Sequence, residues 1–93
     1  MIHVERLDDA EPLTLAVVVR EDGSESRHQV KVRRTTLDRL APGHTPEQCV
    51  TAAFRFLLDR EPKESILGEF ELTVIGRYFP EFERELGDYL PPC

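Results

Sequence analysis

His44 and Cys49 come nearest to a pair of residues that could do chemistry, because a histidine can activate a cysteine nucleophile and both side chains bind zinc. They lie at positions i and i+5 across the expected start of a helix, where their side chains do not face each other well. We therefore expect neither catalysis nor a metal ion there. Cys49 is interpreted as a buried or half-buried thiol and Cys93, the final residue, as a free one.

Four acidic side chains near the C-terminal end, Glu81, Glu83, Glu85 and Asp88, are a second candidate for chemistry. Paired carboxylates act as acid and base only where a cleft separates their pKa values. On the sides of a helix, solvated charge is the ordinary explanation. The sequence also lacks a phosphate-binding glycine loop, a nucleophile elbow and a paired-histidine motif. An enzyme is therefore only the third hypothesis, and no cofactor is expected.

The middle of the chain is basic, although the net charge of the whole chain is −6. Residues 12–44 carry six basic and four acidic side chains. Arg27, Lys31, Arg33 and Arg34 would lie on or just after a β-hairpin, and a two-stranded ribbon can enter the major groove of DNA. Nucleic-acid binders usually have a basic balance overall. We therefore expect no nucleic-acid partner, and keep a weak nucleic-acid-binding or regulatory role as the alternative function.

Tyr78, Phe79, Phe82 and Tyr89 supply more aromatic surface than a short hairpin needs as a cover. Packing in the core is the first explanation for them. Part of this aromatic stripe can instead form an interface with a partner protein or with a second copy of the chain. The leading functional hypothesis is accordingly a small non-catalytic domain that acts through protein contacts, with a homodimer as one form of it.

Residues 13–32 predict a β-hairpin around an Asp-Gly dipeptide at 22–23, which suits a two-residue type I′ turn. Pairing Glu21 with Ser24 puts most of the apolar residues of both strands on one face. His28 falls on the same face. We expect its side chain to be partly buried and hydrogen-bonded rather than catalytic.

A complete helix start signal follows the hairpin. Thr45 is the N-cap, Pro46 occupies the first helical position and Gln48 completes a capping box. The apolar spacing of an amphipathic helix continues from there, and a proline ends the helix near residues 60–61. Short helical turns are expected at residues 35–40 and 62–67.

Residues 68–86 can be interpreted in two ways. The first part alternates apolar and acidic side chains as in a strand. From Ile75 on, five large side chains of this stretch, together with Tyr89 just beyond it, share an arc of about 100° on a helix. Pro80 interrupts that helix but lies on the side opposite the stripe. We favour a kinked or broken helix over residues 73–88 with Thr73 as its N-cap. A short strand at residues 69–72 leading into the helix is the alternative.

These elements predict a single domain, residues 1–93, of the α+β class. In this small two-layer domain an antiparallel β-hairpin, or three strands if residues 2–6 join it, is covered by two amphipathic helices. No apolar stretch is long enough to span a membrane, and the N-terminal residues do not form a secretory signal. We therefore expect no membrane partner and a cytoplasmic location.

Residues 60–85, "REPKESILGEFELTVIGRYFPEFERE", contain a Glu-Pro-Lys-Glu-Ser-Ile-Leu block ahead of a Tyr-Phe-Pro-Glu-aromatic-Glu block. This arrangement resembles small bacterial proteins known only as uncharacterised families. The resemblance covers about the last third of the chain. It implies a bacterial origin and no function.

Overall fold

A computed structural model describes residues 1–92 of the chain, and within them it contains a four-stranded sheet in the order β1-β2-β3-β4. The first three strands are antiparallel neighbours, and the last strand is parallel to the third. The strands are β1 (Ile2–Asp8), β2 (Leu13–Glu21), β3 (Ser24–Val32) and β4 (Glu69–Glu71).

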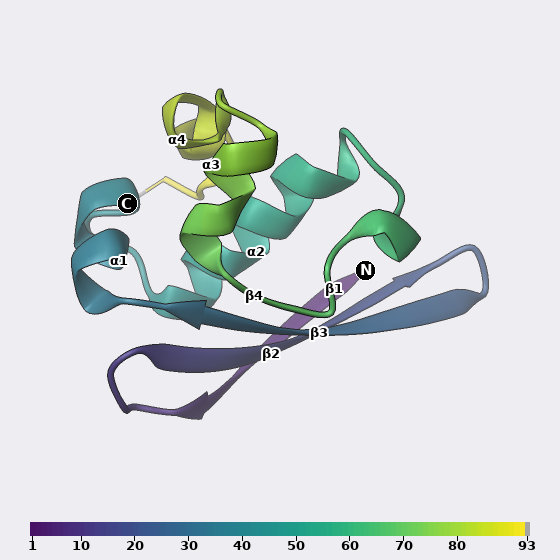
Figure 1. Cartoon of the computed structure of the whole chain (residues 1–93), viewed down its shortest axis with the longest axis horizontal. Coiled ribbons are helices and arrows are strands. Elements are labelled where there is room, and N and C mark those ends of the chain that lie inside the picture. The colour runs from purple at the N-terminus through teal and green to yellow at the C-terminus, as the bar shows by residue number, and fades with distance from the viewer. Residues whose placement is uncertain (93) are drawn as a thin grey trace.

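The helices lie on one face of this sheet, and no helix covers the opposite face (Figure 1). In the described part of the chain they are α1 (Arg34–Leu40), α2 (Pro46–Leu58), α3 (Ile75–Tyr78) and α4 (Phe82–Glu85). Short 3-10 turns precede or follow them: η1 (Lys63–Ser65), η2 (Leu72–Val74) and η3 (Leu86–Tyr89). The predicted α+β class is confirmed. The helical turns expected near residues 35–40 and 62–67 are present as α1 and η1, and α3 and α4 lie where a kinked or broken helix was expected. No helix within residues 1–92 combines the length and apolar character that crossing a membrane requires.

The hairpin forms in the predicted register, beginning with Glu21 opposite Ser24. Asp22 and Gly23 have φ angles of 53° and 76°, as the two central positions of a type I′ turn require. The inward side chains of β2 are buried from Leu13 to Val19. The predicted third strand is also present, because β1 pairs with β2.

The start of α2 is also as predicted. The Thr45 hydroxyl accepts a hydrogen bond from the Gln48 backbone N–H at 3.1 Å, and the Gln48 side chain accepts one from the Thr45 N–H at 2.9 Å. The helix ends at Leu58, slightly before the predicted end. The following residues instead close a tight turn on the Leu57 carbonyl, which directs the chain away before Pro62.

The helix predicted over residues 73–88 is broken. Phe79 adopts φ −130° and ψ 90° because the following proline, Pro80, disfavours helical geometry in the residue before it. The chain therefore leaves α3 after one turn and becomes helical again at α4. Thr73 lies inside η2 and caps no helix, so that N-cap assignment is wrong.

The alternative strand at residues 69–72 is present as β4, which pairs Phe70 with Val30 of β3. A parallel partner needs a long crossover connection, and α1, α2 and η1 supply it. The parallel pairing was not predicted, because no pattern within a single segment reports which distant strand it will join.

The core lies between the sheet and the helices, and α2 contributes to both halves of it. The Phe54 ring faces the sheet side, 5.2 Å from the His28 ring and 6.1 Å from the Phe70 ring. The Phe56 ring faces the C-terminal segment. Its three aromatic neighbours there are Phe79, Phe82 and Tyr89.

Candidate functional site

A surface groove of about 290 Å³ lies where the end of α2, η1, β4 and α3 meet. Its lining is mainly apolar and includes the core residues Leu57, Phe70 and Ile75. Two large apolar side chains of the lining stay exposed, Leu67 at 46% and Tyr78 at 67%. An aromatic ring left in water beside an apolar groove is a typical feature of a binding site.

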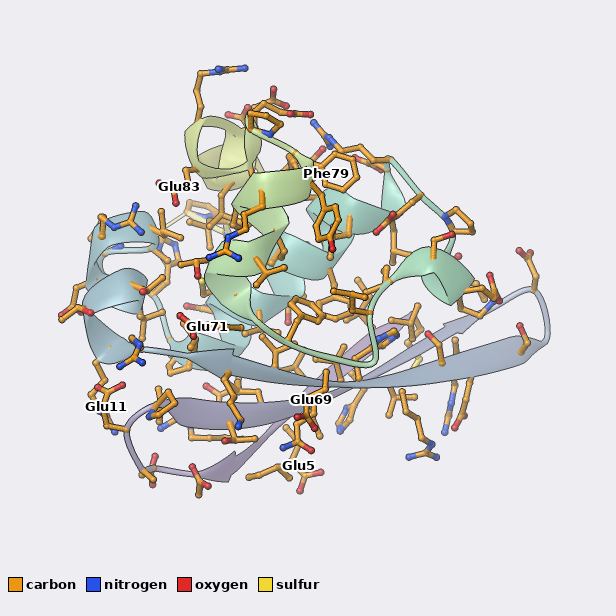
Figure 2. All side chains as sticks on the ribbon, viewed as in Figure 1. Glu5, Glu11, Glu69, Glu71, Phe79 and Glu83 are labelled. Carbon is orange, nitrogen blue, oxygen red and sulfur yellow. The ribbon has the colours of Figure 1, made fainter. Side chains whose placement is uncertain are left out.

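The break in the helix explains why Tyr78 is exposed. In an unbroken helix Tyr78 would share one stripe with Ile75 and Phe79. Because α3 ends at Tyr78, Phe79 turns inward and packs edge-on against the Phe56 ring at 5.9 Å. Figure 2 shows Phe79 extending from the end of α3 toward α2. Tyr78 is left at the surface of the groove.

The loop that carries Leu67 is anchored to the sheet. His28 Nδ1 lies 2.8 Å from the Leu67 carbonyl oxygen, and His28 Nε2 lies 2.7 Å from the Ser26 hydroxyl. A neutral ring that donates from Nδ1 and accepts at Nε2 satisfies both contacts. The Gln29 N–H also donates to the Gly68 carbonyl at 2.8 Å. The predicted hydrogen bonding of His28 is thus confirmed, and the side chain is buried more completely than predicted. It holds one rim of the groove in place.

Glu61 gives the groove a charge. Its side chain is half-buried, and burial raises the pKa of the carboxyl above its ordinary value. Its carboxylate has no hydrogen-bond or ion-pair partner among residues 1–92, since the neighbouring cations bind elsewhere. Arg60 pairs with carboxylates of the α4 region, and Lys63 pairs with Glu64 at 2.7 Å. A cation brought by another molecule would favour the ionised form of Glu61.

The other two aromatic residues predicted as an interaction surface pack against the Phe56 ring, Phe82 within the core and Tyr89 at its edge. Phe82 is fully buried, with its ring 5.1 Å from the Phe56 ring. The half-buried Tyr89 packs on the same ring at 5.8 Å and donates its hydroxyl to the Asp59 carboxylate at 2.7 Å. The predicted stripe is therefore divided: Tyr78 and Phe79 line the groove, Phe82 lies in the core, and Tyr89 is half-buried beside it.

Arg60 forms a polar junction that the sequence analysis missed. Its Cζ atom lies 3.6 Å from the centre of the Phe56 ring, and its guanidinium donates to Glu81 at 3.1 Å and Glu85 at 2.8 Å. Glu83 pairs with an arginine of α1. These three partly exposed carboxylates therefore also join elements together, which the interpretation as solvated charge did not include. The contacts span more than twenty positions along the chain, so helical spacing did not reveal them.

Carboxylates lie beside several of the basic residues proposed for nucleic-acid binding. Arg27 pairs with Glu25 at 2.6 Å. Lys31 lies opposite Glu71 in the parallel register, and Arg33 Nε is 3.8 Å from the same Glu71 carboxylate. These pairs reduce the positive potential that a phosphate backbone would meet.

Arg34 has its own partners near the turn before β2. Its guanidinium donates to the Asp9 carbonyl at 3.0 Å, and its backbone N–H lies 3.3 Å from the Glu11 carboxylate. Glu5 and Glu69 extend from the uncovered face of the sheet (Figure 2). This face carries charges of both signs, which does not favour a polyanionic ligand. Nucleic-acid binding stays an alternative prediction.

The predicted buried thiol is confirmed for Cys49, and burial raises its pKa to about 11. The thiol is therefore protonated at neutral pH and is a poor nucleophile. The ring nitrogens of His44 lie 3.2 Å and 2.6 Å from the carbonyl oxygens of Pro42 and Pro91. Within residues 1–92, no group of three or more His, Cys, Asp or Glu side chains is arranged to hold a metal ion. The free thiol predicted for Cys93 lies outside the described residues.

The chain matches no protein-family model, no curated protein and no solved structure. The resemblance of residues 60–85 to uncharacterised bacterial families therefore stays a prediction. The functional argument depends on the groove itself.

Proposed function

We propose that this is a non-catalytic, cytoplasmic protein-interaction domain. Its groove binds an apolar side chain of a partner protein that carries a lysine or arginine close by. One observation supports the proposal above all: two exposed apolar side chains and one carboxylate without a partner among the described residues line the same groove. These residues are Leu67, Tyr78 and Glu61.

The size of the groove suits one or two side chains of a peptide. Pockets for drug-sized ligands measure about 300 to 1,000 Å³, and this groove, at about 290 Å³, lies at or below the small end of that range. Tyr78 would be covered when the partner binds. Tyrosines that become buried in this way often contribute a large part of the binding free energy.

The charge of the groove selects the partner. Glu61 is half-buried beside apolar side chains, so a basic group that reaches it would form a partly desolvated ion pair. The net charge of −6 also attracts basic partners at long range.

A second copy of the chain fits this groove poorly. In a two-fold symmetric dimer the same patch meets itself. Two Glu61 carboxylates without cations would then approach each other in an apolar setting, which costs free energy. We therefore favour a different, basic protein as the occupant of the groove.

We expect random twelve-residue peptides displayed on phage and selected against the protein to converge on an aromatic or large aliphatic residue close to lysine or arginine. A selected peptide should bind at least about tenfold more weakly to Tyr78→Ala, because truncating a central aromatic residue typically costs 1 to 2 kcal/mol or more. Glu61→Gln should weaken binding of the lysine-containing peptide. Isothermal titration calorimetry measures both effects.

Glu69→Gln is the matched control, because Glu69 is exposed on the uncovered face of the sheet. It should leave peptide affinity unchanged. Replacing the lysine of the peptide with glutamine should weaken binding to the native protein but not to Glu61→Gln. Peptides without a basic residue, or equal affinity for Tyr78→Ala and the native protein, would contradict the proposal.

Glu61 also predicts a pH effect on stability. Its folded-state pKa is raised by burial, so the stability associated with its protonated form is present at low pH and is lost as pH rises through the folded pKa. Glu61→Gln avoids that loss. We expect this variant to be more stable than the native protein at pH 7 by up to about 0.5 kcal/mol, with the difference shrinking toward pH 4. Thermal unfolding of both proteins at the two pH values measures it, and a variant that is less stable at pH 7 would refute it.

A further inference from the structure

The outer edge of β1 has backbone groups that no other part of the described chain pairs. Met1 and Arg20 exchange two backbone hydrogen bonds, at 2.7 Å and 2.8 Å. In an antiparallel ladder, residues whose backbone groups bind the neighbouring strand alternate with residues whose backbone groups point away from it. The N–H and C=O groups of Ile2, Val4 and Arg6 therefore point away from β2, toward the outside of the sheet.

This edge is open. Hollows run along it, one lined by Val4 and Thr51 and another by Ile2 and Leu58. Ile2 and Val4 point to the core side but stay half-buried, whereas the inward residues of β2 have almost no exposed surface. A further strand beside β1 would cover the two half-buried side chains and pair the free backbone groups.

We propose that a second copy of this chain occupies the edge, with the two β1 strands antiparallel across a two-fold axis at Val4. Val4 then faces Val4 of the second copy, and Ile2 faces Arg6. Three such pairs, each exchanging two hydrogen bonds, would join the sheets into one. The axis is perpendicular to the sheet, so both helical layers stay on the same side.

The side chains of β1 on the uncovered face of the sheet are complementary in this register. His3 of each copy faces Glu5 of the other, which places a carboxylate beside an imidazole that can donate to it. Met1 faces Leu7, and these exposed apolar side chains, at 72% and 52%, lie away from the groove. Shifting the register by two residues in one direction puts Glu5 against Glu5, which like charge disfavours, and in the other direction puts His3 against His3. The hydrogen bonds between His3 and Glu5 therefore form only in the register centred on Val4.

Two features of β1 limit how far the pairing extends. An inward-facing charge and a bulge are devices that keep sheet edges apart. Here the charge is the Arg6 side chain, which points to the core side of the sheet. Its guanidinium donates two hydrogen bonds of 2.9 Å to the Glu47 carboxylate of α2. The bulge follows at Leu7. Both lie at one end of the segment, so they end the new ladder after Arg6 and leave residues 2–6 free to pair.

Sedimentation velocity at increasing concentration tests the proposal. We expect the fraction of a dimer, with twice the 10.7 kDa chain mass, to increase at protein concentrations of about 100 μM, because a small interface gives weak affinity. His3→Glu should weaken the dimer by roughly fivefold or more, because two carboxylates then face each other at two symmetric places. Glu5→Lys should also weaken it, because the lysine cannot accept the hydrogen bond that His3 donates. The double variant His3→Glu/Glu5→Lys places a lysine opposite each new glutamate and should recover the dimer.

Val4→Pro provides an independent disruption, since it removes an outward N–H that β2 does not use, and its fold is checked by circular dichroism. Tyr78→Ala should leave the dimer intact, which separates this interface from the peptide groove. The proposal is overturned by a single 10.7 kDa species at about 500 μM, by a dimer unaffected by the single charge variants, or by a double variant that fails to recover. Peptide binding in the groove can succeed or fail independently of each of these results.

Discussion

Leu15→Asp is expected to unfold the domain at 25 °C. Leu15 has no exposed surface and points from β2 into the core. An unpaired carboxylate there must either stay ionised in an apolar setting or be protonated, and both cost several kcal/mol. A small domain has only about 5 to 15 kcal/mol of total stability, so the loss is comparable to the whole. Far-ultraviolet circular dichroism and urea titration measure it.

Ala16→Asp is the matched control at the neighbouring position. Ala16 lies on the uncovered face, between Glu5 and Gln29 on the adjacent strands. Its expected cost is at most about 1 kcal/mol, because aspartate is a poor strand former and would lie near Glu5. Val30→Asp and Gln29→Asp form a second pair with the same expectation. Equal unfolding midpoints for the two members of a pair would mean that the faces of the sheet are assigned the wrong way round.

The hairpin could be predicted in full because its information is local. The turn dipeptide requires positive φ at both positions, and only one register then buries the alternating apolar residues. The capping box of α2 is equally local, since Thr45 and Gln48 bind each other within one turn. Such features depend on a few consecutive residues and leave a clear pattern in the sequence.

The groove could not be predicted, because each of its walls depends on contacts between distant segments. Pro80 was recognised as a helix breaker, but the direction in which the chain turns is set by the packing of Phe79 on Phe56. That contact decides which member of the aromatic stripe stays in water. Leu67 is held at the rim by His28, thirty-nine positions away. Within residues 1–92 the Glu61 carboxylate has no partner because Arg60 pairs with Glu81 and Glu85, a contact that no spacing rule reports.

The packing of the C-terminal segment on α2 leads to a second large expected effect, for Phe56→Ala. The Phe56 ring is fully buried, and Phe82 and Tyr89 pack edge-on against it at 5.1 Å and 5.8 Å. Truncating a buried phenylalanine to alanine costs about 3 to 5 kcal/mol, and the ring also supports the guanidinium of Arg60. We expect a fall of that size in the free energy of unfolding, measured by urea titration.

The fall should begin in the C-terminal segment, because the lost ring is the surface on which residues 79–89 pack. Hydrogen exchange of amides in α4 and η3 should therefore accelerate in Phe56→Ala more than exchange in the β2–β3 hairpin, which Phe54 supports from the other side of α2. Tyr78→Ala is the matched aromatic truncation outside the core. Since the Tyr78 side chain is mostly in water, its cost should stay within about 0.5 kcal/mol. If Tyr78→Ala instead destabilised the domain as much as Phe56→Ala, the aromatic stripe would be continuous in solution. Tyr78 would then belong to the core and would not be available to bind a partner.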